Sequence, residues 1–111
     1  MNIFTVNKYA SQFTQVKALD VSGKGTLKRL KIYFTSMGNG KIGKIRIILK
    51  NNETSSEIPD ILLYCKKKSS DNYYHFKTPL PFNGGFEIWI DNRTNGMTCD
   101  TANIDGMYEL N

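Results

Sequence analysis

The chain is poor in the residues that catalytic sites and disulfide-stapled folds most often use. Its 111 residues include one histidine, one tryptophan and two cysteines. Two cysteines are too few for a disulfide scaffold. Two free, buried thiols are the preferred interpretation, although the sequence leaves open whether Cys65 and Cys99 pair. No stretch approaches the ~18 apolar residues of a membrane span, and the N-terminus lacks the charged and apolar regions of a signal peptide. We therefore expect no membrane segment.

The composition is that of a folded domain. Apolar residues make up 40% of the chain and aromatic residues 12%, which is typical of globular proteins and not of disordered ones. The length suits one modest hydrophobic core. We therefore expect residues 1–111 to form a single domain.

Two stretches alternate between apolar and polar residues with the period of a β-strand. In 29–35 the apolar side carries Leu30, Ile32 and Phe34. In 44–50 it carries Ile45, Ile47 and Leu49. The intervening residues 37–40 tolerate positive φ, so they predict a hairpin that pairs the two strands. Leu27 falls on the wrong parity, which predicts a bulge between it and Leu30.

The rest of the chain also favours short strands. We expect strands at 16–21, 73–77, 86–91, 98–101 and 107–110, the last two separated by a turn at Asp105-Gly106. Residues 51–57 predict a loop. Segment 58–65 stays open between strand and helix, because Pro59 suits an edge strand or a first helical turn. Seven to nine strands with turns every ~8–12 residues predict an all-β, single-domain antiparallel β-sandwich that is jelly-roll-like.

The sequence predicts no catalytic machinery. His75 lies on an aromatic stretch without the neighbouring ligands that a metal site needs, so we interpret it as a packed or surface residue. Asp91, Asp100 and Asp105 lie at turns but lack the spacing of a calcium loop. Nucleophile-elbow, zinc-protease and phosphate-loop motifs are also missing. We expect a protein that is not an enzyme, with no metal and no cofactor.

Charge is segregated along the chain. Residues 1–20 have a net charge of +1, 21–52 of +8, 53–82 of zero and 83–111 of −4. Such polarity suits an anionic partner or the acidic surface of a neighbouring copy. We predict an assembly or docking face on the hairpin and on the strand at 86–91. Its members would be Arg29, Lys31, Tyr33, Lys44, Arg46, Ile48 and Trp89.

Two other binding functions remain as alternatives. A tryptophan between two carboxylates suits a sugar, so Glu87, Trp89 and Asp91 form a possible glycan-binding site, although Trp89 also fits a core or an interface. Basic residues beside Tyr33 are similar in kind to a platform for single-stranded nucleic acid. Only one aromatic joins that patch and no RRM or KH motif occurs, which makes nucleic acid the least favoured partner.

Short motifs resemble those of small structural proteins of tailed bacteriophages. The resemblance lies in Leu19-Asp20-Val21-Ser22-Gly23-Lys24-Gly25-Thr26-Leu27, in the strand Gly43-Lys44-Ile45-Arg46-Ile47-Ile48-Leu49 and in Phe86-Glu87-Ile88-Trp89-Ile90-Asp91-Asn92. It covers about half the chain and departs at Asn51-Asn52, where those proteins have Asp-Gly. It implies a capsid decoration protein, head fibre or tail component of the virion. The partners would be copies of itself, other virion proteins and a host-surface glycan.

Overall fold

All regular secondary structure in the part of the chain that the structure describes is antiparallel β-strand. The computed structural model describes residues 1–35, 42–51, 54–64, 73–93 and 101–111. Its strands are β1 (Asn2–Tyr9), β2 (Gln15–Val21), β3 (Lys24–Thr35), β4 (Ile42–Asn51), β5 (Thr54–Tyr64), β6 (Tyr74–His75), β7 (Leu80–Asp91) and β8 (Thr101–Leu110). No helix in these residues is long and apolar enough to span a membrane.

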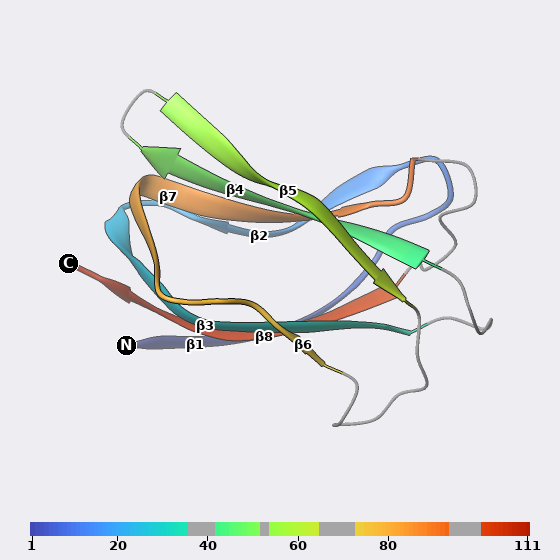
Figure 1. Cartoon of the computed structure of the whole chain (residues 1–111), viewed down its shortest axis with the longest axis horizontal. Helices are drawn as coiled ribbons and strands as arrows, with labels where there is room; N and C mark the ends of the chain where they lie inside the picture. Colours follow the sequence, from blue (N-terminus) through green and yellow to red (C-terminus); the bar gives the residue numbers. More distant parts are fainter. Residues whose placement is uncertain (36–41, 52–53, 65–72, 94–100) are drawn as a thin grey trace.

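The strands form two facing layers with jelly-roll topology (Figure 1). The lower layer has the order β1-β8-β3-β6, and the upper layer has the order β2-β7-β4-β5. Eight antiparallel strands in two four-stranded layers of this order have the arrangement of a jelly roll. The prediction of an antiparallel, jelly-roll-like sandwich is therefore confirmed.

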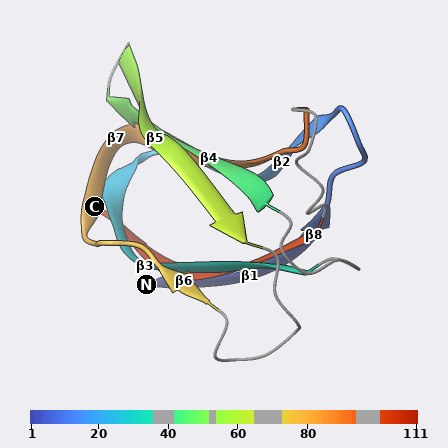
Figure 2. The same ribbon diagram turned by 45° about the vertical axis from the view of Figure 1, so that its right-hand side comes forward.

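One side of the sandwich is closed because β7 passes from one layer to the other (Figure 2). Its first residues, 80–83, pair with β3 of the lower layer, and residues 83–91 pair with β4 of the upper layer. Gly85 lies at this corner with a φ of +118°, and a Cβ there would collide with the carbonyl oxygen of Val21. Only glycine suits both constraints, so this residue lets β7 join the layers into one continuous sheet.

The core lies between the layers. Ile32, Phe34, Ile45, Ile47, Ile88 and Ile90 are all buried in one hydrophobic cluster, as the alternation predicts. Phe86 is at the centre of an aromatic group and contacts the rings of Phe4, Phe82 and Tyr108. Because alternate side chains of a strand point to opposite faces, the basic and polar residues between the core positions are sent to the two outer faces.

The predicted hairpin of 29–35 with 44–50 is wrong. β3 pairs with β8, β6 and the start of β7, whereas β4 pairs with β5 and β7. In a jelly roll most consecutive strands belong to opposite layers, and β3 and β4 accordingly lie in different layers. The tip at 37–40 lies outside the described residues.

Of the other predictions about strands and loops, some are confirmed and some are wrong. The bulge is confirmed, since the β3–β8 register shifts between Leu27 and Arg29. Segment 58–64 is a strand, but β5 begins at Thr54, so most of the predicted loop at 51–57 is strand. The predicted strand at 73–77 is shorter, with only residues 74–75 in β6. Cys65 and Cys99 lie outside the described residues.

The predicted turn at Asp105-Gly106 is also wrong, because β8 is one continuous strand from Thr101 to Leu110. Gly106 is buried, and a Cβ there would collide with the Phe4 ring and with the carbonyl oxygen of Arg29. This glycine therefore permits close packing within a strand and does not mark a turn.

Candidate binding faces

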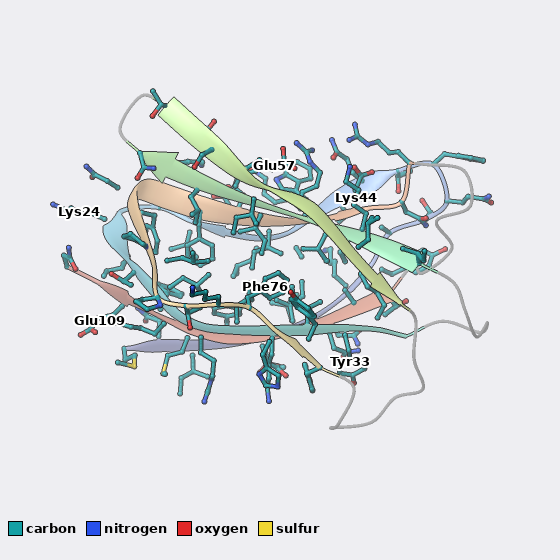
Figure 3. All side chains as sticks on the ribbon, viewed as in Figure 1. Lys24, Tyr33, Lys44, Glu57, Phe76 and Glu109 are labelled. Carbon is teal, nitrogen blue, oxygen red and sulfur yellow. The ribbon has the colours of Figure 1, made fainter. Side chains whose placement is uncertain are left out.

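The residues of the predicted docking face lie on two opposite surfaces. Arg29, Lys31 and Tyr33 belong to β3 in the lower layer, whereas Lys44, Arg46, Ile48 and Trp89 belong to β4 and β7 in the upper layer. Figure 3 shows Tyr33 below the lower layer and Lys44 above the upper one. The structure thus separates the seven residues into two groups with the core between them.

On the upper face, Arg46 links three strands. Its Nε donates to Glu57 Oε1 at 2.7 Å and its Nη2 to Glu57 Oε2 at 3.1 Å, across to β5. Its Nη1 donates to Gln15 Oε1 of β2 at 2.7 Å, so the side chain passes over β7. The guanidinium lowers the pKa of the Glu57 carboxyl through these hydrogen bonds. The guanidinium of Arg46 is therefore already hydrogen-bonded to residues of its own chain.

Trp89 occupies the middle of this face and is also engaged. It lies between Lys17 and Arg46 in the strand register, and the Lys17 ammonium stands 5.3 Å from the ring centroid, as in a cation–π pair. Its Nε1 donates to Glu87 Oε1 at 2.8 Å. Lys50 contacts the other oxygen of Glu87 at 2.9 Å, and this hydrogen bond is the main reason why the pKa of Glu87 is lowered.

The third member of the possible glycan site is buried. The residue Asp91 is only 3% exposed. Both of its carboxylate oxygens accept hydrogen bonds from Arg93, at 2.9 Å each from Nε and Nη2, and these bonds lower the pKa of Asp91. Glu87, Trp89 and Asp91 do project to the same face, as predicted. Each is already bonded to a neighbour, so a sugar would have to displace those contacts.

The lower-layer cations form no salt bridge with any residue in the described part of the chain. Among the described residues, no carboxylate lies within 4.0 Å, the limit for a salt bridge, of any of the six lower-layer cations, which are Lys8, Lys24, Lys28, Arg29, Lys31 and Lys77. The salt bridges in the same residues connect side chains of the upper layer, and one of them joins Asp91 to Arg93. Six cations against Asp105 and Glu109 give the lower layer a net charge of +4. The five acids and five bases of the upper layer, Arg93 included, cancel. The excess positive charge of the described residues is thus on one side.

Within the lower face, Tyr73 covers part of β3. Its ring meets Tyr33 edge-on at 4.4 Å and lies 4.4 Å from the Lys31 ammonium. Burial and a hydrogen bond to Asp105 raise the pKa of Tyr73. Tyr33 is consequently only 6% exposed, so it cannot serve as a base-stacking platform in this conformation. Residues 74–76 run antiparallel to residues 30–32 of β3, and continuing this register by one residue places Lys77 opposite Arg29.

The isolated histidine is exposed on β6 opposite Lys31, as the surface interpretation of His75 predicts. Among the described residues, no group of three His, Cys, Asp or Glu side chains is placed to hold a metal ion. Asp91 bonds Arg93 and Asp105 bonds Tyr73, while Asp100 lies outside the described residues.

A third surface has no counterpart in the sequence predictions. Four large apolar side chains are exposed along β1 and on the residues that flank it: Met1 is 69% exposed, Ile3 74%, Tyr9 59% and Phe13 61%. β1 was not predicted as a strand, although its alternation of Phe4 and Val6 with polar residues was a usable signal. Its position at a sheet edge, in contrast, depends on pairing with residues about a hundred positions away.

No protein-family model, curated protein or solved structure matches the chain.

Proposed function

We propose that the protein is a non-enzymatic structural component of a bacteriophage virion and that it works by assembling with copies of itself and with other virion proteins. The observation that carries this proposal is the row of large exposed apolar side chains along the β1 edge and its flanks, at Met1, Ile3, Tyr9 and Phe13. Apolar side chains exposed along one sheet edge are better understood when another protein covers them.

Two further points support the virion setting. The jelly roll is used by viral capsid domains and by lectins, so the fold is compatible with the proposal without establishing it. The residues that resemble phage structural proteins also have structural roles here. Val21 to Leu27 span the crossing from β2 to β3, and the 44–49 and 86–92 motifs form adjacent strands of the upper layer.

Two measurements test this function. Sedimentation of the purified chain across a wide concentration range should show reversible self-association. Antibody labelling of purified phage particles, viewed by electron microscopy, should mark regular positions. A chain that stays monomeric at millimolar concentration and is missing from the particles would overturn the proposal.

A polyanion, such as nucleic acid, is a second candidate partner because the lower-layer cations form no salt bridge within the described ranges. Lys28, Arg29 and Lys31 lie close together along β3, and the continued register of residues 74–76 places Lys77 opposite Arg29. For single-stranded nucleic acid, each phosphate contact contributes about −0.7 to the slope of log affinity against log salt. Titration with an oligonucleotide should show a slope that Lys28→Ala with Arg29→Ala reduces by about 1.4.

Lys44→Ala is the matched control for this titration, because Lys44 forms no salt bridge among the described residues but lies on the opposite layer. It should leave the slope unchanged. Equal effects of the two sets of variants would indicate attraction by net charge alone.

The glycan alternative has weaker support because Trp89 and both flanking carboxylates are engaged by Lys17, Lys50 and Arg93. A specific hit on a glycan array that Trp89→Ala abolishes would revive it.

A further inference from the structure

The N-terminal strand leaves one edge of the lower layer open. All eight residues of β1 pair with β8, and in the part of the chain that the structure describes β1 pairs with no other strand. The opposite edge therefore presents backbone N–H and C=O groups without strand partners. Such an edge is a template for another strand, so its guards decide whether pairing is prevented.

The two outer strands of the upper layer are interrupted by a proline or a bulge, and β1 is not. β5 contains Pro59, and its register with β4 shifts at that point. β2 is bulged between Lys17 and Leu19. Proline and bulges are common ways to block edge pairing. β1 has an uninterrupted register, no proline and one charged residue, Lys8, so it is straight enough to continue the sheet.

The side chains of β1 fit a second copy of the same strand. Phe4 and Val6 pack against the core, so Ile3, Thr5, Asn7 and Tyr9 point to the outer face. A two-fold axis at Val6 would place Ile3 opposite Tyr9 of the second copy and Thr5 opposite Asn7 of the second copy. Pairs of aromatic and β-branched residues are favourable across antiparallel strands.

Shifting the two-fold axis to Thr5 gives a poorer match. Ile3 would then face Asn7 of the second copy, and Tyr9 would face Met1, which lies outside the strand. The Val6 register is the one that brings together the two most exposed apolar residues of the strand.

Charge also permits the approach of two copies at this edge. The grouped cations Lys28, Arg29, Lys31 and Lys77 lie on β3 and the 74–77 segment, which β8 separates from β1. Each β1 brings a single ammonium group to the contact, so repulsion there is small although the chain as a whole carries +5.

We propose that β1 pairs antiparallel with β1 of a second copy about a two-fold axis at Val6, which joins the two lower layers into one sheet. This inference rests on the proposed self-assembly and specifies its first contact. The joined sheet would carry a cationic patch toward each end, where further partners remain free to bind.

Disulfide trapping tests the register in the full chain, with Cys65 and Cys99 replaced by serine. Residues directly opposite in an antiparallel pair have Cα atoms about 4.5–5.5 Å apart, which suits a disulfide. A mixture of Thr5→Cys and Asn7→Cys proteins should form a cross-linked heterodimer under mild oxidation. Thr5→Cys alone should cross-link poorly, and efficient cross-linking of that variant with itself would overturn the Val6 register.

Charged substitutions on the outer face of β1 test whether this strand forms the contact between the two copies. Ile3→Lys with Tyr9→Lys should raise the dissociation constant of the dimer by at least about tenfold, measured by sedimentation. Leu62→Lys is the matched control because Leu62 is 48% exposed on the opposite edge, on β5. It should leave association unchanged, and circular dichroism should show that all variants fold.

The outcomes separate this inference from the proposed function. Self-association that survives Ile3→Lys with Tyr9→Lys, together with no cross-linking between Thr5→Cys and Asn7→Cys, would overturn β1 pairing and leave assembly through another surface. A monomer at every concentration that is also missing from phage particles would overturn both. Cross-linking of the mixture and loss of the dimer in the double variant would support both.

Discussion

Arg46 holds Glu57 through two nitrogens, at 2.7 and 3.1 Å, and reaches Gln15 with a third at 2.7 Å. One side chain thereby connects the outermost strands of the upper layer, β5 and β2, across β4 and β7. Arg46→Lys should lower the free energy of unfolding by about 0.5–1 kcal/mol, because lysine cannot make the two-pronged contact and Glu57 is partly solvated. Urea denaturation measures the change.

Lys44→Arg serves as the control for this substitution, since Lys44 lies on the same strand without a salt bridge among the described residues. Its unfolding free energy should stay within about 0.5 kcal/mol of the original. An Arg46→Lys variant as stable as the control would show that the bridge over β7 contributes no net stability.

Adjacent residues on β4 test the two faces of the strand. Ile47 is fully buried, whereas its neighbour Ile48 points outward and is half-buried. Ile47→Ala should cost about 2–5 kcal/mol because it leaves a cavity in the core. Ile48→Ala should cost less than about 1 kcal/mol, as expected of a surface site. Equal losses by chemical denaturation would contradict the parity of the strand.

The corner of β7 gives a test of backbone constraint. Gly23 and Gly85 have nearly equal φ values, +116° and +118°, but a Cβ on Gly85 would meet the Val21 carbonyl while one on Gly23 would meet only the Leu110 side chain at 3.5 Å. Gly23→Ala should cost about 1–2 kcal/mol from its conformation. Gly85→Ala should cost more, or prevent folding. Similar thermal midpoints for the two variants would refute the steric argument.

Stability should fall in acid because of the upper-layer carboxylates. The pKa values of Asp20, Glu57, Glu87 and Asp91 are lowered, in each case mainly by a hydrogen bond to a basic side chain. A carboxyl whose pKa is lowered in the folded state stabilises the fold at pH values above its ordinary pKa, which is 3.8 for Asp and 4.5 for Glu. This stability is lost as the pH falls through the lowered pKa. Urea midpoints measured from about pH 6 to pH 2 should therefore decrease.

Asp91→Asn identifies one contributor to this acid loss, because it removes the ionisable group and keeps the shape. The fall in stability between about pH 5 and pH 2 should be smaller in this variant. If the stability of the variant falls as much as that of the unaltered protein, the contact of Asp91 with Arg93 does not contribute to the acid sensitivity.

The sequence predicts which residues are buried better than which strands pair. Ile32 and Ile47 are buried as predicted, because the side-chain period of a strand is a local property. Strand pairing is not local: Asn2 lies beside Tyr108, and β3 and β4, which are neighbours along the chain, lie in different layers. The predicted docking face depended on pairing those two strands, so the structure divides it between two surfaces.

In the candidate sites, too, the direction of a side chain is predictable from the sequence, whereas its contacts with other strands are not. The common outward direction of Glu87 and Trp89 is predictable from alternation. The lysines that engage them come from β2 and β4, and only the tertiary structure reveals those contacts. The exposed edge at β1 is likewise a property of the strand order.

The central position of β8 affects the order in which the chain folds during translation. β8 lies between β1 and β3, so β1, which is synthesised before the other described strands, has no neighbour in its layer until residues 101–110 have been synthesised. The lower layer must therefore form after most of the polypeptide has emerged. Until then the apolar faces of β1 and β3 are exposed together, and a chaperone or a neighbouring nascent chain has its best opportunity to bind them.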